Sequence, residues 1–229
     1  MLILSLDTST AACSVALHHN NSLLGSYELF TERTSAAMLT TLLEQVVEHS
    51  GYSLKQIDAV AVAKGPGSYT GLRIGVSTAK GLCFALDKPL VAINTLTGMT
   101  EQVRPYYQPG YTLCPMIDAR RMEVYCALYN ISGEEIEPTS ARIIDENSFA
   151  QWLAQGPVVF FGDGAAKCRT VLSYSPSAVF IDQPVVPSAR TIGKLATAAF
   201  ERSAFENMAT FEPLYLKDFM TTKPKKVVF

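Results

Sequence analysis

Histidine is scarce in this chain, whose 229 residues include only His18, His19 and His49. There is no His-Glu-x-x-His motif and no plausible Ser/His/Asp set, so the sequence argues against a peptidase. We interpret the three histidines as solvated side chains, two in a turn and one at a helix end. The five cysteines are scattered and form no Cys-x-x-Cys pair. That usage is typical of small buried hydrophobes in a reducing compartment.

An excess of charge of one sign is also lacking. The chain has 19 basic and 21 acidic residues, a net charge of −2 and a pI near 5.9. It therefore lacks the basic composition of a stand-alone nucleic-acid-binding protein. No apolar run is long enough to cross a bilayer, and the N-terminal residues lack the basic segment and cleavage site of a signal peptide. These absences predict a cytoplasmic protein that makes no membrane contact.

Apolar residues are plentiful, at 48% of the chain, which is enough for a sizeable core. The length suits two lobes of about a hundred residues each. In the first half, the hydrophobic pattern predicts a three-stranded antiparallel meander followed by alternating helices and strands. The predicted strands are 2–6, 13–17, 23–30, 57–63 and 89–93, and the predicted helices are 35–50, a helix ending near 86, and 95–103.

A segment dense in turn residues, 105–110, is the best candidate for a lobe boundary. We therefore assign residues 1–106 to one lobe and 107–229 to the other, with the final helix free to pack back on the first lobe. The second half is predicted to contain strands at 112–117, 123–129, 143–144, 158–161 and 178–181, and helices at 147–153, 165–172 and 189–203. Each lobe should be a mixed sheet flanked by helices.

The most informative stretch is 65–75, Gly-Pro-Gly-Ser-Tyr-Thr-Gly-Leu-Arg-Ile-Gly, where a buried strand turns into a helix. A glycine-rich turn at a helix N-terminus is suited to bind an anion, because free N–H groups and the helix dipole point the same way. A second interpretation is close packing, since glycine or alanine recurs every four residues and makes one helix face smooth. The spacing does not fit a P-loop, because no Gly-Lys-Ser/Thr follows.

These motifs together resemble a known family. An Asp-Thr-Ser at 7–9 that ends the first strand, the 65–75 motif, Gly-Asp-Gly-Ala at 162–165 and Pro-Leu-Tyr-Leu-Lys at 213–217 resemble the TsaB (YeaZ) family. The resemblance spans nearly the whole chain. It implies an α/β, two-lobed actin/Hsp70/sugar-kinase-like (ASKHA) fold. Lys217 stands where the family often has arginine, which keeps the charge.

The resemblance implies a non-catalytic subunit in the synthesis of N6-threonylcarbamoyladenosine at position 37 of tRNA. A TsaD-type transferase and a TsaE-type ATPase would be its partners, with tRNA bound only within the complex. The catalytic paralogue carries His-x-x-x-His on the helix after its fifth strand, whereas this chain has Thr95 and Met99 there. Both are poor ligands for a dication, so we expect no catalytic residue and no metal. The alternative is a small-molecule kinase or an ATP-dependent carbamoyl transferase that acts alone.

The cofactor prediction stays open between two interpretations. A carboxylate at a strand end can orient a metal–phosphate, or it can accept backbone N–H bonds and cap its own loop. We expect no cofactor that the chain binds by itself, with a nucleotide allowed at the interface of the complex. The weak candidates for nucleotide contact are Asp7, Thr8, Ser9, Gly162, Asp163 and Gly164.

Helices 35–50 and 69–86 are the predicted docking surface, through which the chain could also form a homodimer when alone. Arg120 and Arg121 lie in a predicted hairpin, where they could contact tRNA phosphate or remain solvated. The lysines of the C-terminal tail could likewise contact tRNA phosphate or remain solvated. The predicted partner-binding residues are Met38, Leu42, Gly67, Gly71, Gly75 and Ala79, and the tail lysines are Lys223, Lys225 and Lys226.

Overall fold

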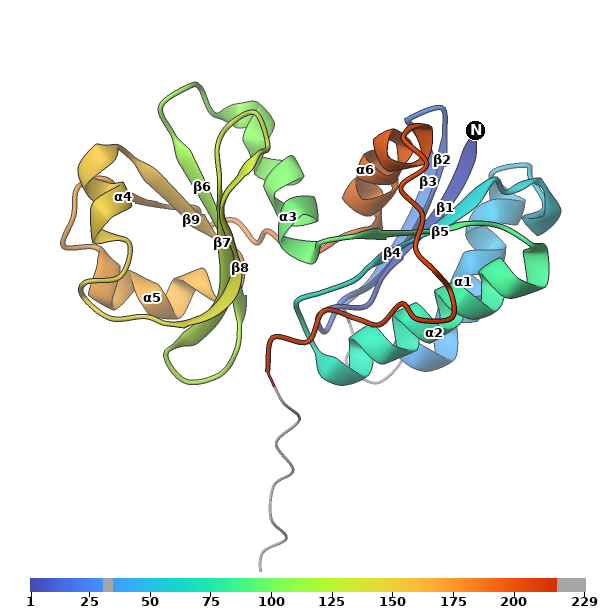
Figure 1. Ribbon diagram of the computed structural model, residues 1–229, viewed down its shortest axis with the longest axis horizontal. Coiled ribbons are helices and arrows are strands. Elements are labelled where there is room, and N and C mark those ends of the chain that lie inside the picture. The colour runs from blue at the N-terminus through green and yellow to red at the C-terminus, as the bar shows by residue number, and fades with distance from the viewer. Residues whose placement is uncertain (31–34, 218–229) are drawn as a thin grey trace, which may run out of the picture.

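The computed structural model describes residues 1–30 and 35–217, which form two lobes, each built on a five-stranded sheet (Figure 1). In chain order, the elements up to the end of the first sheet are β1 (Leu2–Asp7), β2 (Cys13–His19), β3 (Ser22–Leu29), α1 (Ser35–His49), η1 (Leu54–Gln56), β4 (Ala59–Ala63), α2 (Tyr69–Leu86) and β5 (Leu90–Ile93). The others are α3 (Thr95–Val103), η2 (Arg104–Tyr106), β6 (Thr112–Asp118), β7 (Glu123–Tyr129), β8 (Glu135–Ile143), α4 (Ala150–Gln155), β9 (Val158–Phe161), α5 (Ala165–Leu172), β10 (Ala178–Phe180) and α6 (Ala189–Glu201).

The sheet of the first lobe has the strand order β3-β2-β1-β4-β5. β1, β2 and β3 are antiparallel neighbours, whereas β4 pairs parallel to β1 and β5 parallel to β4. This confirms the predicted meander followed by two crossovers. α1 and α2 cover one face of the sheet and bury its main apolar cluster (Figure 1).

The sheet of the second lobe has the order β10-β9-β6-β7-β8, with β6, β9 and β10 parallel. The largest departure from the sequence prediction is β8, which covers nine residues instead of the two predicted at 143–144. Its residues are mixed and mostly half-buried, so no apolar run marks them. α4 also begins three residues later than predicted, at Ala150.

The boundary between the lobes lies earlier than the predicted 106/107. α3 follows β5 directly, yet Leu96, Met99 and Val103 pack in one cluster with β6, β7 and β9. The chain therefore enters the second lobe near Asn94, which caps α3 by accepting a hydrogen bond from the N–H of Leu96. The turn-dense segment 105–110 is a loop inside that lobe, because the apolar face of α3 decides which sheet the helix joins.

α6 returns to the first lobe, as the sequence allowed, and covers the face of the sheet opposite α1 and α2 (Figure 1). Ile192 and Ala196 pack there against Ile3 and the alanines of β4. Gly193 lies against the His18 ring and the Ser5 hydroxyl, where a Cβ would clash. His18 is only 3% exposed, so the prediction that it is solvated was wrong. His18 lies on an apolar strand, and its ring is buried because the close approach of α6 removes it from water.

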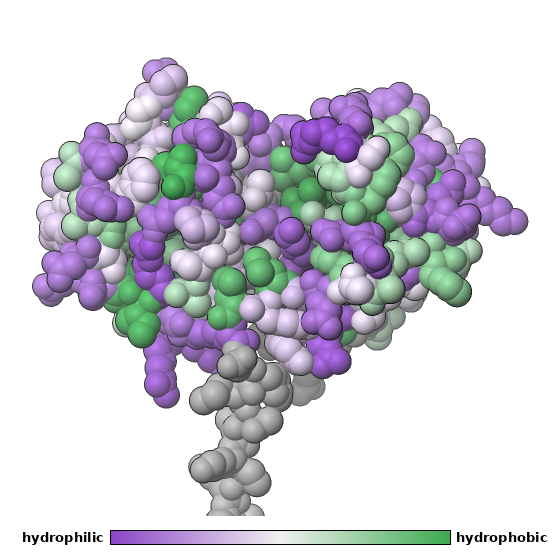
Figure 2. All heavy atoms as spheres, in the orientation of Figure 1, coloured by the Kyte–Doolittle hydropathy of each residue, from purple (hydrophilic) through white to green (hydrophobic). Residues whose placement is uncertain are grey.

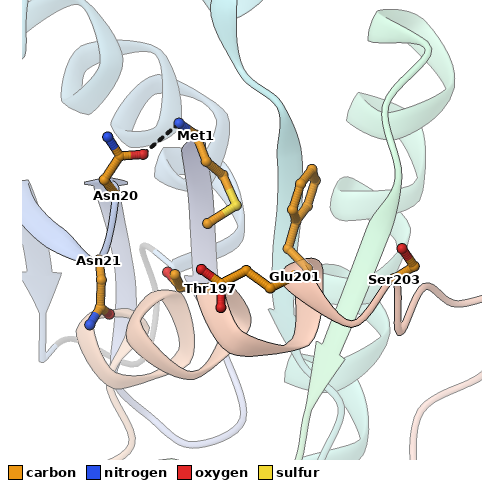
Figure 3. Close-up of a pocket in the computed structure, with 7 residues that line it drawn as sticks. Met1, Asn20, Asn21, Thr197, Glu201 and Ser203 are labelled. Atoms are coloured by element: carbon orange, nitrogen blue, oxygen red, sulfur yellow. Dashed lines mark hydrogen bonds between the residues drawn. The ribbon is translucent and has the colours of Figure 1, made fainter.

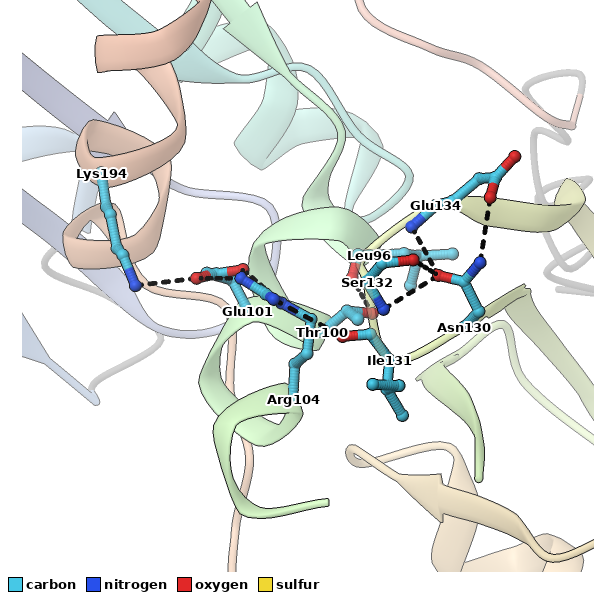
Figure 4. Close-up of polar contacts among 9 residues, drawn as sticks. All are labelled: Leu96, Thr100, Glu101, Arg104, Asn130, Ile131, Ser132, Glu134 and Lys194. Carbon is cyan, nitrogen blue, oxygen red and sulfur yellow. Dashed lines mark hydrogen bonds and ion pairs between the residues drawn. The ribbon is translucent and has the colours of Figure 1, made fainter. Parts of the chain in front are cut away.

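The two lobes are connected by an ion cluster between α3 and α6 (Figure 4). The buried carboxylate of Glu101 accepts hydrogen bonds from Arg104, which directly follows α3, and from Lys194 of α6. The hydrogen bond from Lys194 is 2.7 Å long. Burial works against the charged form, but these hydrogen bonds outweigh it and lower the pKa of Glu101. Gly98 lets α3 approach α6 closely, since a Cβ there would lie 3.0 Å from Ile192 Cδ1.

Residues 203–217, which we call the C-terminal strap, run along the first lobe and end between the two lobes (Figure 1). Backbone hydrogen bonds fix the strap beside β5 and β4, from Glu206 N to Leu90 O and from Leu214 N to Lys64 O. Lys80 of α2 also donates to Phe211 O. Across residues 1–30 and 35–217, no helix combines the length and apolar character needed to cross a membrane.

Candidate functional site in the cleft between the lobes

A cavity of about 710 Å³ lies where the two lobes meet the end of the C-terminal strap. The first lobe contributes the loop after β1 and the N-terminus of α2, and the second lobe contributes the β6–β7 hairpin and the turn after β9. Of the predicted cofactor residues, Ser9 and Asp163 line this cavity. The lining residues are Ser9, Thr10, Ala11, Gly67, Ser68, Tyr69, Thr70, Ile117, Asp118, Ala119, Arg120, Arg121, Glu123, Tyr125, Asp163 and Lys217.

The loop after β1 bonds several of its polar groups within the chain, whereas Asp7 Oδ2 is buried without a hydrogen-bond partner. Asp7 is 1% exposed, and its Oδ1 accepts hydrogen bonds from the N–H and hydroxyl of Ser9, at 2.8 and 2.6 Å. Burial raises the pKa of Asp7 to about 6. Thr8 Oγ1 donates to Gly71 O at 2.7 Å, and Ser68 N donates to Ser9 O at 2.6 Å. The interpretation of Asp7 as a residue that caps its own loop agrees with this geometry.

The smooth face of α2 packs on that same loop. A Cβ at Gly67 would clash with Ser9 O, and one at Gly71 would clash with Thr8 O. Gly75 abuts the Thr8 side chain, and Ala79 is fully buried in the core. Close packing is confirmed, but the contact is with the chain's own loop and not with a partner helix.

Three of the six predicted partner-binding residues are therefore corrected. Gly75 and Ala79 are buried, as just described, and Leu42 of α1 is a core residue at 5% exposure. Gly67 and Gly71 are half-buried against the loop after β1. Met38 is half-buried against that core. The sequence pattern identified a face without side chains, but it does not say which element covers that face.

Some of the groups that could bind a phosphate at this loop are bonded within the chain. An anion at the start of α2 needs free N–H groups, yet the Ser68 N–H is bonded to Ser9 O. The Ser68 hydroxyl also accepts the N–H of Gly71. The buried Asp7 carboxylate is not among the residues that line the cavity.

The glycine turn of the second lobe is similarly filled. Gly164 lies against the backbone of Ile117, and a Cβ atom at Gly162 would lie 2.7 Å from Met99 Cε. Asp163 Oδ1 accepts a hydrogen bond from Asp118 N at 2.9 Å, and burial raises the pKa of Asp163. Only Asp163 of these three residues reaches the cavity, so Gly162 and Gly164 have a packing role.

Lys217 closes one side of the cleft and was noted in the sequence only as a family variation. Its Nζ pairs with Glu123 and donates to Ala119 O at 3.2 Å, 5.9 Å from the Tyr125 ring centroid. The C-terminal strap thus connects the first lobe to the β6–β7 hairpin. No local signal marks this contact, because the two residues are far apart in the sequence.

The positions compared with the paralogue's histidines, Thr95 and Met99, both lie on α3 and are fully buried. Met99 belongs to the apolar cluster of the second lobe, and Thr95 N donates to Gly65 O. Across the residues that the structure describes, no group of three or more His, Cys, Asp or Glu is placed to hold a metal ion. That the purified chain binds no metal stays a prediction.

The outer face of α2 carries an exposed aromatic residue that the sequence analysis did not single out. Phe84 is 83% exposed, one position after the buried Cys83. Between Ile74 and Leu86 the helix has one charged residue, Lys80, whose ammonium is bonded to Phe211 O. Figure 2 shows a pale green area over the C-terminal half of α2, at the lower right of this view. Phe84 lies outside the apolar stripe of α2 that faces the core. An aromatic residue at such a position is the sequence signal that could have identified it.

A second cavity, of about 520 Å³, lies at the far end of the first lobe (Figure 3). It is an open hollow beside the N-terminal ammonium, which donates to Asn20 Oδ1 at 2.7 Å. Thr197 and Glu201 of α6 form its other side. None of the predicted site residues lies here.

The buried Asp7 and His18 are expected to give opposite pH dependences of stability. Asp7 titrates near pH 6 in the folded chain and 3.8 ordinarily, so its contribution falls as the pH rises between these values. Burial and the nearby Arg190 lower the pKa of His18 from 6.5 to about 4, so its contribution rises with pH. At about 1.4 kcal/mol per pH unit, each amounts to about 3 kcal/mol, and the two largely cancel.

Single substitutions should therefore reveal the pH dependence that each of these two groups gives to the free energy of unfolding. Urea unfolding at pH 4.5, 5.5 and 6.5 should show Asp7→Asn gaining stability relative to wild type as the pH rises. His18→Gln should lose stability relative to wild type over the same range. If both variants run parallel to wild type, neither group has the shifted pKa that its burial implies.

Known proteins are similar to this chain over its length. The family model described as "TsaD: tRNA N6-adenosine threonylcarbamoyltransferase" matches residues 29–229. A protein of Escherichia coli named tRNA threonylcarbamoyladenosine biosynthesis protein TsaB is 30% identical over 230 aligned residues, covering 97% of both chains. The solved structure of YeaZ from Pseudomonas aeruginosa has a TM-score of 0.78 and 30% identity, covering 94% of this chain and 99% of that one.

A more distant structure agrees with the expected fold class. The activator of 2-hydroxyisocaproyl-CoA dehydratase from Clostridium difficile, solved with bound ADPNP, has a TM-score of 0.52 at 11% identity. The match covers 89% of this chain and 97% of that one. At such an identity the likeness concerns the fold alone, and it confirms the two-lobed ASKHA fold.

Proposed function

The chain belongs to the TsaB (YeaZ) family, and from this premise we propose that it supports threonylcarbamoyl transfer to tRNA without catalysing the transfer itself. Its role in the biosynthesis of tRNA threonylcarbamoyladenosine is accessory. The catalytic partner is a TsaD-type transferase, a protein related to this chain, since the transferase family model matches residues 29–229. A TsaE-type ATPase joins the pair, and tRNA binds only to the assembled complex in the cytoplasm.

The observation that carries this proposal is that the residues of the motifs that could take part in catalysis are buried or bonded within the chain. Thr95 and Met99 are buried where the paralogue's two histidines would lie, and neither side chain can ligate a dication exposed to substrate. The Asp7 loop is bonded to the start of α2. A self-sufficient kinase or carbamoyl transferase would need that loop open to phosphate. Any nucleotide of the complex is held with a partner at the interface.

The surface that pairs with the transferase is the outer face of α2, with Phe84 at its centre and the neighbouring helix α1 in the same layer. Exposed aromatic side chains of this kind are frequent anchors of protein interfaces. In the absence of the transferase, the same face serves a homodimer, because a two-fold axis lets one patch act on both sides. A homodimer of the isolated chain would therefore agree with the proposal.

Reconstitution tests the proposed function directly. Threonylcarbamoyladenosine formation is measured with a TsaD-type transferase, a TsaE-type ATPase, an adenylate-forming enzyme and tRNA, with and without this chain. We expect product only when the chain is present, and no turnover by the chain alone with ATP, threonine and bicarbonate. Equal modification without the chain, or turnover by the chain alone, would contradict the proposal.

A further inference from the structure

The turn of the β6–β7 hairpin places two arginines side by side at the cleft. Arg120 and Arg121 have φ of +71° and +49°, the left-handed region that asparagine and glycine adopt most readily in turns. Asparagine and glycine suit such a turn, whereas a longer side chain makes it less favourable. Both side chains are exposed and both line the 710 Å³ cavity. The hairpin therefore has arginine where its own folding favours another residue.

The ion pairs around the turn do not include these two guanidinium groups. Lys167 pairs with Asp118, and Lys217 pairs with Glu123. Within residues 1–30 and 35–217, no carboxylate lies within ion-pair distance of Arg120 or Arg121. The remaining carboxylate of the cavity, Asp163, is exposed, and its Oδ1 accepts the N–H of Asp118. The rim of the cavity thus carries two guanidinium groups that belong to no ion pair, while the carboxylates of Asp118, Glu123 and Asp163 lie in the same lining.

Aromatic rings lie beside this charge. Tyr215 of the C-terminal strap stacks on Tyr69 of α2, with ring centroids 5.0 Å apart, and is 38% exposed. Lys217, two residues after Tyr215 in the chain, donates a hydrogen bond to the carbonyl oxygen of Ala119, the residue that precedes Arg120. Guanidinium groups that line one cavity with a tyrosine ring match a nucleic-acid strand, whose phosphates need cations and whose bases stack on rings.

We infer that Arg120 and Arg121 contact the phosphodiester backbone of tRNA when the complex binds it. This inference rests on the proposed function and adds a surface of this chain to it. A free mononucleotide suits the site less well, because the loop that would hold its phosphates is closed by the Thr8 and Ser9 contacts. The contact contributes affinity and orientation, since phosphates carry no sequence information.

The test uses a charge-removing change that favours the turn, Arg120→Asn with Arg121→Gly. Its matched control, Lys55→Ala with Arg202→Ala, removes two exposed positive charges away from the cleft. In the reconstituted complex with varied tRNA, we expect the turn variant to raise KM for tRNA about tenfold and to lower kcat less than twofold. The control should match wild type. Arg120→Lys with Arg121→Lys should recover most of the affinity, because the charge is kept.

Direct binding of fluorescent tRNA to the complex gives a second readout. The slope of log K against log salt should shrink by about 1.4 for the loss of two single-strand phosphate contacts. An unchanged KM and slope, or an equal loss in the control, would overturn the inference. So would a turn variant that loses affinity for ADP and not for tRNA. If the wild-type chain does not support modification, the proposed function fails, and tRNA binding to the assembled complex, measured without turnover, still decides the inference.

Discussion

Replacing Gly71 by alanine is expected to destabilise the chain by about 3 kcal/mol, whereas the same change at an open position inside a helix is stabilising. The added Cβ would clash with Thr8 O, a backbone atom that cannot move without shifting the loop after β1. The hydrogen bonds from Thr8 Oγ1 to Gly71 O and from Ser68 N to Ser9 O would be lost or stretched. Thermal unfolding should show a midpoint lowered by about 10 °C for a chain of this size.

Gly81 provides the control on the same helix. A Cβ there has no neighbour within 4 Å, and the residue is exposed. Gly81→Ala should stabilise the chain by about 0.5 to 1 kcal/mol, because alanine has the higher helix propensity. If both variants gain stability, the contact between α2 and the loop after β1 is not formed in solution. A charge at Gly75 would likewise test folding and not assembly, since that residue touches Thr8.

Replacing Phe84 by aspartate is expected to weaken the pairing with the TsaD-type transferase at least about 100-fold. A central aromatic anchor is typically worth 2 kcal/mol or more, and an unpaired charge in its place adds a desolvation cost. Because Phe84 is 83% exposed in the monomer, folding should be nearly unchanged. Affinity is measured by titration calorimetry, and threonylcarbamoyladenosine formation should fall in parallel at limiting concentrations.

Tyr106 supplies a matched control, since it is 84% exposed and lies in the second lobe. Tyr106→Asp should leave both pairing and modification at wild-type levels. Wild-type affinity in the Phe84 variant would show that the outer face of α2 is not the docking surface. Equal losses in both variants would point to a general effect of exposed acidic charge.

Elements with a strong local signal were predicted well from the sequence. The apolar runs of β1 and β4 are recognisable without any tertiary information, because buried parallel neighbours require both faces to be apolar. α2 begins and ends as predicted, since Ser68 caps its start and Asp87, in a left-handed conformation, ends it. The meander and its two crossovers then left few possible topologies for the first sheet.

What could not be predicted depends on which surfaces meet. β8 has no apolar run, and its pairing with β7 is decided by the second lobe as a whole. α3 has an amphipathic pattern that fits either sheet. The same limit applies to the site, where the glycines of α2 indicated close packing but not the loop that they contact. The burial of His18 and the contact of Lys217 with the hairpin depend on residues more than 90 positions away.

The return of α6 and the C-terminal strap to the first lobe has a consequence for synthesis on the ribosome. The lobe that emerges first is completed last, because one face of its sheet waits for residues 189–201 and its β5 edge for residues near 206. Until then Ile3, Val91 and the alanines of β4 have no cover. The second lobe, by contrast, is continuous in the nascent chain from residue 94 onward. Vectorial folding should therefore proceed from the middle of the polypeptide outward, and a truncation before α6 would leave an apolar sheet face open to aggregation.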